Sequence, residues 1–282
     1  NADKYKARGI HFVSNEHVVL ESSKHTRMMQ VKENWESSSA FVYNLNTKKI
    51  KVLLSNSKGL FPAQEGLGLI VGFNKDSREL YMPAYAGRFG VTPKYHLYRV
   101  SLKNGRGKVH AKGNSSTQRW FVDGTGKVLA REDYNPSTQS HEIYSNVSGN
   151  WQTIYSYKTP IPEFTPQALS DDGSRLLLLS GDGNNLAVFS MSLKDGDIQG
   201  PLYVREGTDV GELETDINQT LIAVKYSGFT PSYEFNNAED NESYSILADH
   251  FSYSSVNVHG KTADNNKWLI SVSGNEGAGA YK

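Results

Sequence analysis

The sequence contains no cysteine among its 282 residues. Disulfides, thiolate catalysis and cysteine-ligated zinc are therefore excluded, and the redox compartment is left open. An excess of one charge is also missing, because 30 Lys and Arg residues balance 30 Asp and Glu residues. We therefore expect no overall field that would attract nucleic acid or an anionic membrane. No apolar run approaches the roughly 18 residues of a membrane span, and no signal peptide is recognisable.

Local signatures of catalysis and of cofactor binding are missing as well. No Gly-x-Ser-x-Gly elbow occurs, although an α/β-hydrolase needs one to raise its nucleophile above the sheet. The glycine-rich segments near Gly66 and Gly124 lack the spacing of a dinucleotide or phosphate loop. His141-Glu142 has no second His four residues after the first, and Asp195-Gly196-Asp197 lacks the ligand series of a calcium loop. We predict no catalytic, cofactor-binding or metal-binding residues in this chain.

What the sequence does contain is a strand–turn–strand unit that recurs. Its clearest copy is Thr165–Gly181, in which the polar turn Ser170–Gly173 separates two apolar runs. Asp and Gly favour such a turn, because an Asp side chain bonds nearby backbone and Gly accepts a positive φ. In five successive copies the starts of the second strands are 45 to 48 residues apart. These starting positions are Leu80, Val128, Leu176, Leu221 and Trp268, and a looser copy begins at Val18.

A period of roughly 40–50 residues with about four strands per unit is typical of a β-propeller. The sequence therefore predicts an all-β propeller of four-stranded blades, with about six blades visible. We interpret Asn1-Ala2 as the remainder of an expression tag and residues 3–282 as one propeller domain, itself part of a larger protein. The last copy has only two predicted strands, Ser254–Val258 and Trp268–Val272, and is expected to be truncated where a third would begin near Ala280.

Two segments depart from the repeat. The polar stretch Glu21–Ser39 interrupts the first unit and is expected to be an inserted loop, which is uncommon between neighbouring strands unless it is functional or disordered. Asn236–Asp249 is expected to be a helix, capped by Asn236 or Asn237, with acidic residues in its first turn. We favour a packing role for this helix over a partner-binding one.

The order of these segments resembles the propeller of the prolyl oligopeptidase family of serine peptidases, which includes dipeptidyl aminopeptidases and acylaminoacyl peptidases. The similar segments are Ser170–Leu179, Ala223–Phe235 with the helix after it, and Val256–Lys282. The resemblance implies a seven-bladed propeller that covers a C-terminal α/β-hydrolase domain, which carries the catalytic triad and is absent from this chain. It implies one further blade at the N-terminus, and peptides and the hydrolase domain as partners. The propeller's expected role is to gate the entry of short peptides.

One feature of some family members has no equivalent here. Dipeptidyl aminopeptidases hold the substrate's amino terminus with a pair of glutamates, whereas Glu33 and Glu36 flank Trp35 with a different spacing. The peptidase subtype is therefore open, and Glu21–Ser39 is the first segment to test. The alternative is a TolB-like scaffold that binds a protein and has no enzymatic activity. A propeller enzyme acting at its own central channel ranks last. Either bacterial compartment is compatible, with the periplasm favoured over the cytoplasm.

Overall fold

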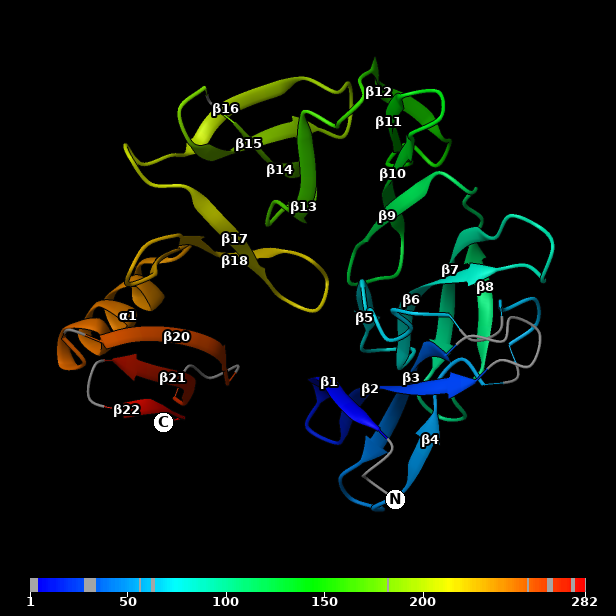
Figure 1. Ribbon diagram of the computed structural model, residues 1–282, viewed down its shortest axis with the longest axis horizontal. Coiled ribbons are helices and arrows are strands. Elements are labelled where there is room, and N and C mark those ends of the chain that lie inside the picture. Colours follow the sequence, from blue (N-terminus) through cyan, green and yellow to red (C-terminus); the bar gives the residue numbers. More distant parts are fainter. Residues whose placement is uncertain are drawn as a thin grey trace. The chain divides into compact units, whose positions relative to one another are not determined.

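The computed structural model describes residues 5–27, 34–55, 57–61, 64–181, 183–252, 254–262, 266–274 and 277–281. These residues form 22 strands and one helix, with the strands in six antiparallel sheets (Figure 1). The all-β propeller fold is thereby confirmed. The chain divides into two compact units, which are described separately below. The first unit comprises Asn1–Pro162 with Leu193–Gly196 and Ile217–Gln219, and the second comprises Glu163–Ser192, Asp197–Asp216 and Thr220–Lys282.

The first unit contains three four-stranded sheets, each with its strands side by side in chain order. The first sheet consists of β1 (Lys6–Ser14), β2 (His17–Arg27), β3 (Asn34–Asn44) and β4 (Ile50–Val52). The second sheet consists of β5 (Gly72–Asn74), β6 (Glu79–Ala86), β7 (Lys94–Ser101) and β8 (Gly107–Ala111). The third sheet consists of β9 (Thr117–Val122), β10 (Val128–Asn135), β11 (Ser140–Ser145) and β12 (Gln152–Lys158). Each sheet is one propeller blade.

The second unit contains one four-stranded and two three-stranded sheets in its described part. The four-stranded sheet consists of β13 (Phe164–Leu169), β14 (Arg175–Gly181), β15 (Leu186–Ser192) and β16 (Ile198–Tyr203). The next sheet consists of β17 (Val210–Thr215), β18 (Leu221–Tyr226) and β19 (Ser232–Phe235), and the helix α1 (Ala238–His250) follows it. The last sheet consists of β20 (Ser254–Lys261), β21 (Trp268–Gly274) and β22 (Gly277–Tyr281).

The last sheet corrects the prediction of a two-stranded remnant. Its third strand, β22, pairs with β21, with Ser271 opposite Tyr281 and Val272 opposite Ala280. The sequence of β22 is Gly-Ala-Gly-Ala-Tyr, which has no alternating large apolar residues and therefore gives no strand signal. Backbone hydrogen bonds to β21 hold it in the sheet.

The repeated turn has the chemistry that its sequence indicates. Asp123 Oδ1 accepts the backbone N–H groups of Thr125 and Lys127, each at 2.9 Å. In the next copy Asp172 Oδ1 accepts the N–H of Ser174 at 3.0 Å. Strands β10, β18 and β21 begin at the predicted residues, and β6 and β14 begin one residue earlier. The repeat therefore locates the second strand of each of these sheets.

The helix α1 begins one turn after β19, close to its predicted position. Asn237 is the N-cap, and its Oδ1 accepts the N–H of Asp240 at 2.8 Å. The buried ring of Tyr244 packs between Tyr233 and Phe235, at ring-centroid distances of 5.1 and 5.8 Å. Tyr244 and Leu247 of α1 therefore pack against the sheet, whereas Ile246 is exposed.

The stretch Glu21–Ser39 is not a loop inserted into the first blade, and that prediction is wrong. Strands β2 and β3 pair without a break from His17 opposite Asn44 to Arg27 opposite Asn34, so the segment lengthens the blade's two central strands. Most of its residues are Ser or charged, so the sequence has no alternation of apolar and polar residues to indicate a strand. Residues 28–33 lie outside the described part.

Among the described residues, the far end of this hairpin has no neighbouring strand. The pairing of β1 with β2 stops at Lys6 opposite Ser23, and the pairing of β3 with β4 stops at Phe41 opposite Val52. Beyond Ser23 the described parts of the two strands pair only with each other, and we call this ribbon the arm. Side chains of Tyr5 and Lys6 still contact Lys24 and His25 at its base. A two-stranded ribbon alone is only marginally stable in water.

The two faces of the first sheet have different environments. One face packs on the second sheet in a core of buried side chains that includes Val19, Val42, Leu80, Met82 and Tyr98. Burying side chains of this size contributes roughly 1.5–3 kcal/mol each.

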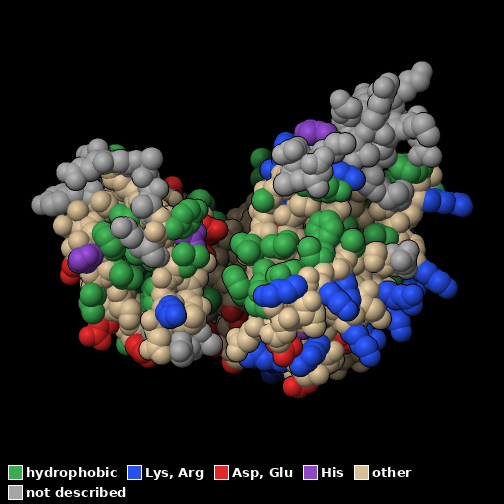
Figure 2. Space-filling model, turned by 90° about the horizontal axis from the view of Figure 1, so that it is seen from below, with side chains coloured by type: hydrophobic (Ala, Val, Ile, Leu, Met, Phe, Trp, Pro, Cys, Tyr) green, Lys and Arg blue, Asp and Glu red, His purple; other side chains and the backbone are tan. Residues whose placement is uncertain are grey.

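The other face of the first sheet is apolar and exposed. Ile10 lies opposite Leu20, Leu20 opposite Phe41, and Phe41 opposite Val52, which makes one apolar row across all four strands. Ile10 and Phe12 are 61% and 72% exposed. We call this surface, formed by Ile10, Phe12, Leu20, Phe41 and Val52, the open face. Figure 2 shows that hydrophobic side chains gather in a broad band on the first unit.

Candidate functional site

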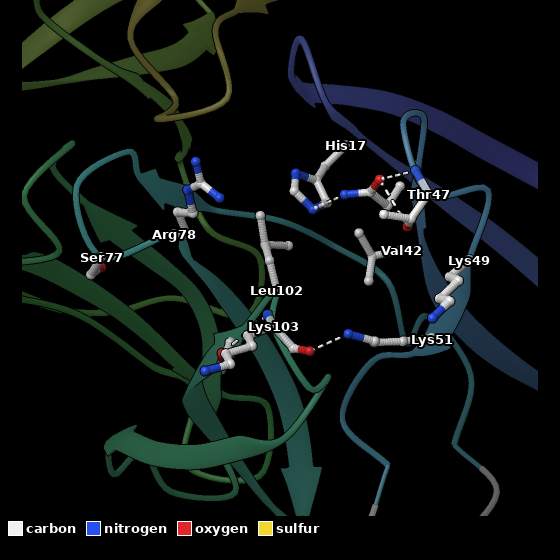
Figure 3. Close-up of a pocket in the computed structure, with 11 residues that line it drawn as sticks. His17, Val42, Thr47, Lys49, Lys51, Ser77, Arg78, Leu102 and Lys103 are labelled. Carbon is white, nitrogen blue, oxygen red and sulfur yellow. Dashed lines mark hydrogen bonds between the residues drawn. The ribbon is translucent and has the colours of Figure 1, made fainter.

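A cavity of about 600 Å³ lies in the first unit, between the turns of its first two sheets. The connections β1–β2 and β3–β4 meet at one end of the first sheet, because antiparallel strands return to the same end at every second connection. The connections β5–β6 and β7–β8 do the same in the second sheet. Figure 3 shows side chains from these four turns around the cavity, which we call the turn-end pocket. Its lining includes His17, Lys49, Lys51, Arg78, Leu102 and Lys103.

The pocket is basic. Four Lys and Arg side chains contribute to its lining, and no carboxylate does. Among the described residues, Glu16 is the one acidic partner of these cations, and its Oε2 lies 3.7 Å from Nη1 of Arg78 with both side chains exposed. The Nζ of Lys51 donates to the backbone carbonyl of Lys103. This bond joins the β4 wall to the β7–β8 turn.

Hydrogen bonds around Asn44 order the opposite wall. Asn44 Oδ1 accepts the backbone N–H groups of Asn46 and Thr47 at 3.1 and 2.7 Å, which directs its Nδ2 toward His17. Asn44 Nδ2 lies 3.0 Å from His17 Nε2, and Ser14 Oγ lies 3.3 Å from His17 Nδ1. Because an amide nitrogen only donates, Nε2 of His17 accepts here. The imidazole is held in place on both sides.

The zero net charge of the chain is divided unevenly between its two units. Counted over the sequence, the first unit has 24 Lys and Arg against 13 Asp and Glu, whereas the second has 6 against 17. Their formal charges are therefore +11 and −11. The total charge of zero therefore results from two units of large and opposite formal charge. Figure 2 shows Lys and Arg side chains gathered at one end of the first unit.

The base of the arm contains the glutamate singled out from the sequence. Glu36 pairs with Arg8, accepts a 2.6 Å hydrogen bond from Ser23 Oγ, and lies 3.7 Å from Nζ of Lys6. The hydrogen bond from Ser23, then the one from Arg8, lower the pKa of Glu36 to about 2. The carboxylate of Glu36 is therefore already paired with Arg8 and Lys6 on β1 of the same sheet. Glu33 lies outside the described residues.

A second, smaller cavity of about 300 Å³ lies beside this ion pair, and Arg8, Glu21, Glu36 and Glu65 are among its lining residues. Glu21 Oε1 lies 3.1 Å from Nε2 of His11, and this hydrogen bond raises the pKa of His11. Two of the three glutamates in this cavity therefore have partners on β1. Of these contacts, those of Glu36 join the arm to β1 through side chains.

The comparisons with known proteins concern the fold. No protein-family model matches the chain, and no curated protein matches it in sequence. A structure from a study of two prolyl endopeptidases, concerned with inter-domain dynamics in catalysis and specificity, matches with a TM-score of 0.54 at 9% identity. This match covers 99% of the present chain and 42% of the prolyl endopeptidase chain. In fold, the chain resembles the propellers of prolyl oligopeptidase-type peptidases.

Two further peptidase structures match with lower scores. The β-propeller domain of the Trilobed protease from Pyrococcus furiosus, described as having an open velcro topology, has a TM-score of 0.45 at 11% identity, covering 99% of this chain and 97% of that domain. An acylaminoacyl peptidase in complex with a chloromethyl ketone has a TM-score of 0.38 at 9% identity, and this match covers 96% of the present chain and 58% of the acylaminoacyl peptidase chain. The present chain spans less than half the length of the prolyl endopeptidase.

The described part of the chain contains neither a metal-binding cluster nor a helix that could span a membrane. No group of three or more His, Asp or Glu residues there is placed to hold a metal ion. No helix in that part is long and apolar enough to span a membrane.

Sequence reasoning did not find the turn-end pocket. Its signal is the position of basic residues in three turns at one end of two blades: Lys49 beside the β3–β4 turn, Arg78 in the β5–β6 turn and Lys103 in the β7–β8 turn. These residues are separated by about 25 residues along the chain, so no local motif exists. Only the order of turns in the repeat brings them together.

Proposed function

We propose that this chain is the propeller domain of a serine peptidase of the prolyl oligopeptidase family. In this proposal the propeller covers a C-terminal α/β-hydrolase domain outside the chain and limits which peptides reach it. The observation that carries the proposal is the likeness in fold to a prolyl endopeptidase over 99% of this chain, which accounts for 42% of that enzyme. The segment order from Ser170 to Lys282 supports the same family.

The arm is the element that we assign to gating. Within the described part of the chain, its strands beyond Ser23 pair only with each other, so it can bend without breaking the four-stranded part of the blade. Its base is fastened by Arg8, Ser23 and Glu36. An arm that is fixed at its base and whose described strands pair only with each other beyond it can obstruct large substrates and yield to short peptides.

The open face supports the expectation of a further blade. Neighbouring blades in a propeller bury apolar faces against each other, as the first and second sheets do here. The row from Ile10 to Val52 has the composition of such a packed face, but its end strands are exposed. We therefore propose that an additional blade of the parent protein, as in a seven-bladed propeller, packs on the open face.

The first test is the gene beyond the codon for Lys282. We expect an open reading frame of roughly 250 residues that contains Gly-x-Ser-x-Gly and then Asp and His in that order. A stop codon within the length of one blade would refute the peptidase proposal. It would leave the alternative of a propeller that binds a protein partner.

The second test addresses gating in the full-length enzyme. Replacing residues 24–37 with Asn-Gly keeps the pair Ser23 and Ser38 and closes the hairpin with a favoured two-residue turn. We expect cleavage of long peptides to rise relative to cleavage of short ones. Glu36→Gln is the matched control, because it weakens the ion pair at the base and retains the arm. If trimming leaves the peptide-length preference unchanged, the arm does not gate.

A further inference from the structure

We propose that the turn-end pocket binds an acidic peptide in extended conformation. This inference does not depend on the proposed peptidase function, because the pocket lies wholly within the first unit of this chain. It rests on three observations: a cavity of adequate volume, a lining with cations and no carboxylate, and the positive charge of the unit around it.

The volume and the charge together indicate an anionic ligand larger than an ion. A cavity of about 600 Å³ is within the usual range for ligand-binding pockets, roughly 300–1,000 Å³. Lys49 and Lys103 have no ion-pair partner among the described residues, and Arg78 has only the exposed Glu16 at 3.7 Å. The surplus of positive charge on this unit favours the approach of anions to its own surface, although the whole chain is neutral.

The placement of the cations favours several separate carboxylates over one phosphate. A phosphate site usually offers converging backbone N–H groups or a bidentate arginine. Here the lining contains one Arg and three Lys, which come from different strands and turns, and Figure 3 shows them spread around the cavity. In an extended peptide the side chains on one face repeat every ~6.6 Å, so alternate acidic residues can each meet a different cation.

The lining also favours a peptide over nucleic acid. Single-stranded nucleic acid is usually held by aromatic rings on which its bases stack. The pocket has no Phe, Tyr or Trp in its lining. It has instead the apolar side chains of Val42 and Leu102, and the hydroxyl groups of Ser77 and Ser101. These groups suit the aliphatic side chains and the backbone of a peptide.

The wall of the pocket is ordered before a ligand arrives. Asn44 holds the β3–β4 turn and His17, and Lys51 is tied to the carbonyl of Lys103. A ligand therefore orders few groups when it binds, which lowers the entropic cost of association.

The test is direct binding to the 282-residue chain. Fluorescein-labelled (Glu-Ala)4 and (Lys-Ala)4 peptides are titrated and followed by fluorescence anisotropy at low and at physiological salt. We expect saturable binding of the Glu peptide that weakens as salt rises, and no binding of the Lys peptide. Binding of both peptides, or of neither, would overturn the proposal.

Charge-reversal variants locate the site. In Lys49→Glu/Lys103→Glu, two attractive contacts become repulsive, so we expect affinity for the Glu peptide to fall by about tenfold. The matched control is Lys94→Glu/Lys158→Glu, which changes the net charge equally at two exposed positions outside the pocket lining. We expect the control to change affinity less than twofold. Equal losses in the two variants would mean that only the overall charge is sensed, and the pocket would be refuted as the site.

Two other ligands are tested in parallel. Tighter binding of a single-stranded oligonucleotide than of the Glu peptide would refute the peptide assignment. So would a dimer in sedimentation velocity that Lys49→Glu/Lys103→Glu abolishes, because the acidic second unit of another copy would then be the ligand. The Lys49→Gln/Lys103→Gln variant removes the two charges without reversing them, so it tests the site if the charge-reversal variant does not fold. We expect it to weaken peptide binding by about threefold.

Discussion

Gly105 offers a sharp test of the packing between the first two blades. It lies in the β7–β8 turn with φ +70°, and its N–H donates to the carbonyl of Ser101 at 2.8 Å. A Cβ added at Gly105 would lie 2.2 Å from the backbone oxygen of Val52 on β4. Because that neighbour is backbone, no change of rotamer relieves the contact.

The magnitude follows from two costs. An L-residue in the left-handed region costs about 1–2 kcal/mol, and overpacking against a fixed neighbour costs about 1–3 kcal/mol. Gly105→Ala is therefore expected to lower the free energy of unfolding by about 2–5 kcal/mol. Gly90 is the matched control, since it has φ +82° and no atom within 4 Å of an added Cβ. Gly90→Ala should lose only the conformational cost, about 1–2 kcal/mol.

The assay is urea unfolding followed by tryptophan fluorescence, with the shift in midpoint compared at unchanged slope. Gly105→Ala should also weaken the Glu-peptide affinity, because the same turn carries Lys103, whereas Gly90→Ala should not. If the two variants lose the same stability, the close approach of the β7–β8 turn to β4 is wrong.

Three further predictions concern the arm, the helix and the open face. The pKa of Glu36 is about 2 in the folded chain and 4.5 without its partners, so its contribution to stability is present above pH ~4.5 and disappears as pH falls toward 2. The urea midpoints of the parent and of Glu36→Gln should therefore differ at pH 6 and converge near pH 2. A difference that stays constant with pH would contradict the ion pair assigned to Glu36. Asn237→Ala removes the cap of α1 and should lower the free energy of unfolding by about 1 kcal/mol, most of which Asn237→Ser retains, as measured by circular dichroism in urea. Phe12→Asp, on the open face, should change the free energy of unfolding by less than about 0.5 kcal/mol because the Phe12 ring is 72% exposed. It should also reduce concentration-dependent association of the chain in sedimentation velocity. A large loss of stability would show that the open face is already packed.

The periodic features of the fold could be predicted from the sequence, because they follow from turn chemistry. Asp123 and Asp172 bind the backbone of their own turns, so each marks the start of a second strand without help from the rest of the chain. The helix was predictable for the same reason, since the Asn237 cap is local.

The features that depend on pairing between strands could not be predicted in this way. The arm belongs to the stretch Glu21–Ser39, most of whose residues are Ser or charged, and β22 consists of Gly and Ala before its final Tyr. Backbone pairing therefore forms both without an apolar signal. The turn-end pocket needs Lys49, Arg78 and Lys103 to meet across two blades. The charges of +11 and −11 on the two units can be counted in the sequence, but the boundaries of the units come only from the structure.

The two proposed sites of the first unit can be separated by mutation. The β2–β3 connection lies at the opposite end of the blade from the β1–β2 and β3–β4 turns, because strand direction alternates. The arm and the turn-end pocket therefore lie at opposite ends of the same sheet, and a peptide bound in the pocket does not touch the arm. Trimming residues 24–37 should leave the Glu-peptide affinity unchanged, and Lys49→Glu/Lys103→Glu should leave the peptide-length preference of the full enzyme unchanged. If either variant alters both properties, the two sites act as one, and the pocket would then belong to the path of the substrate.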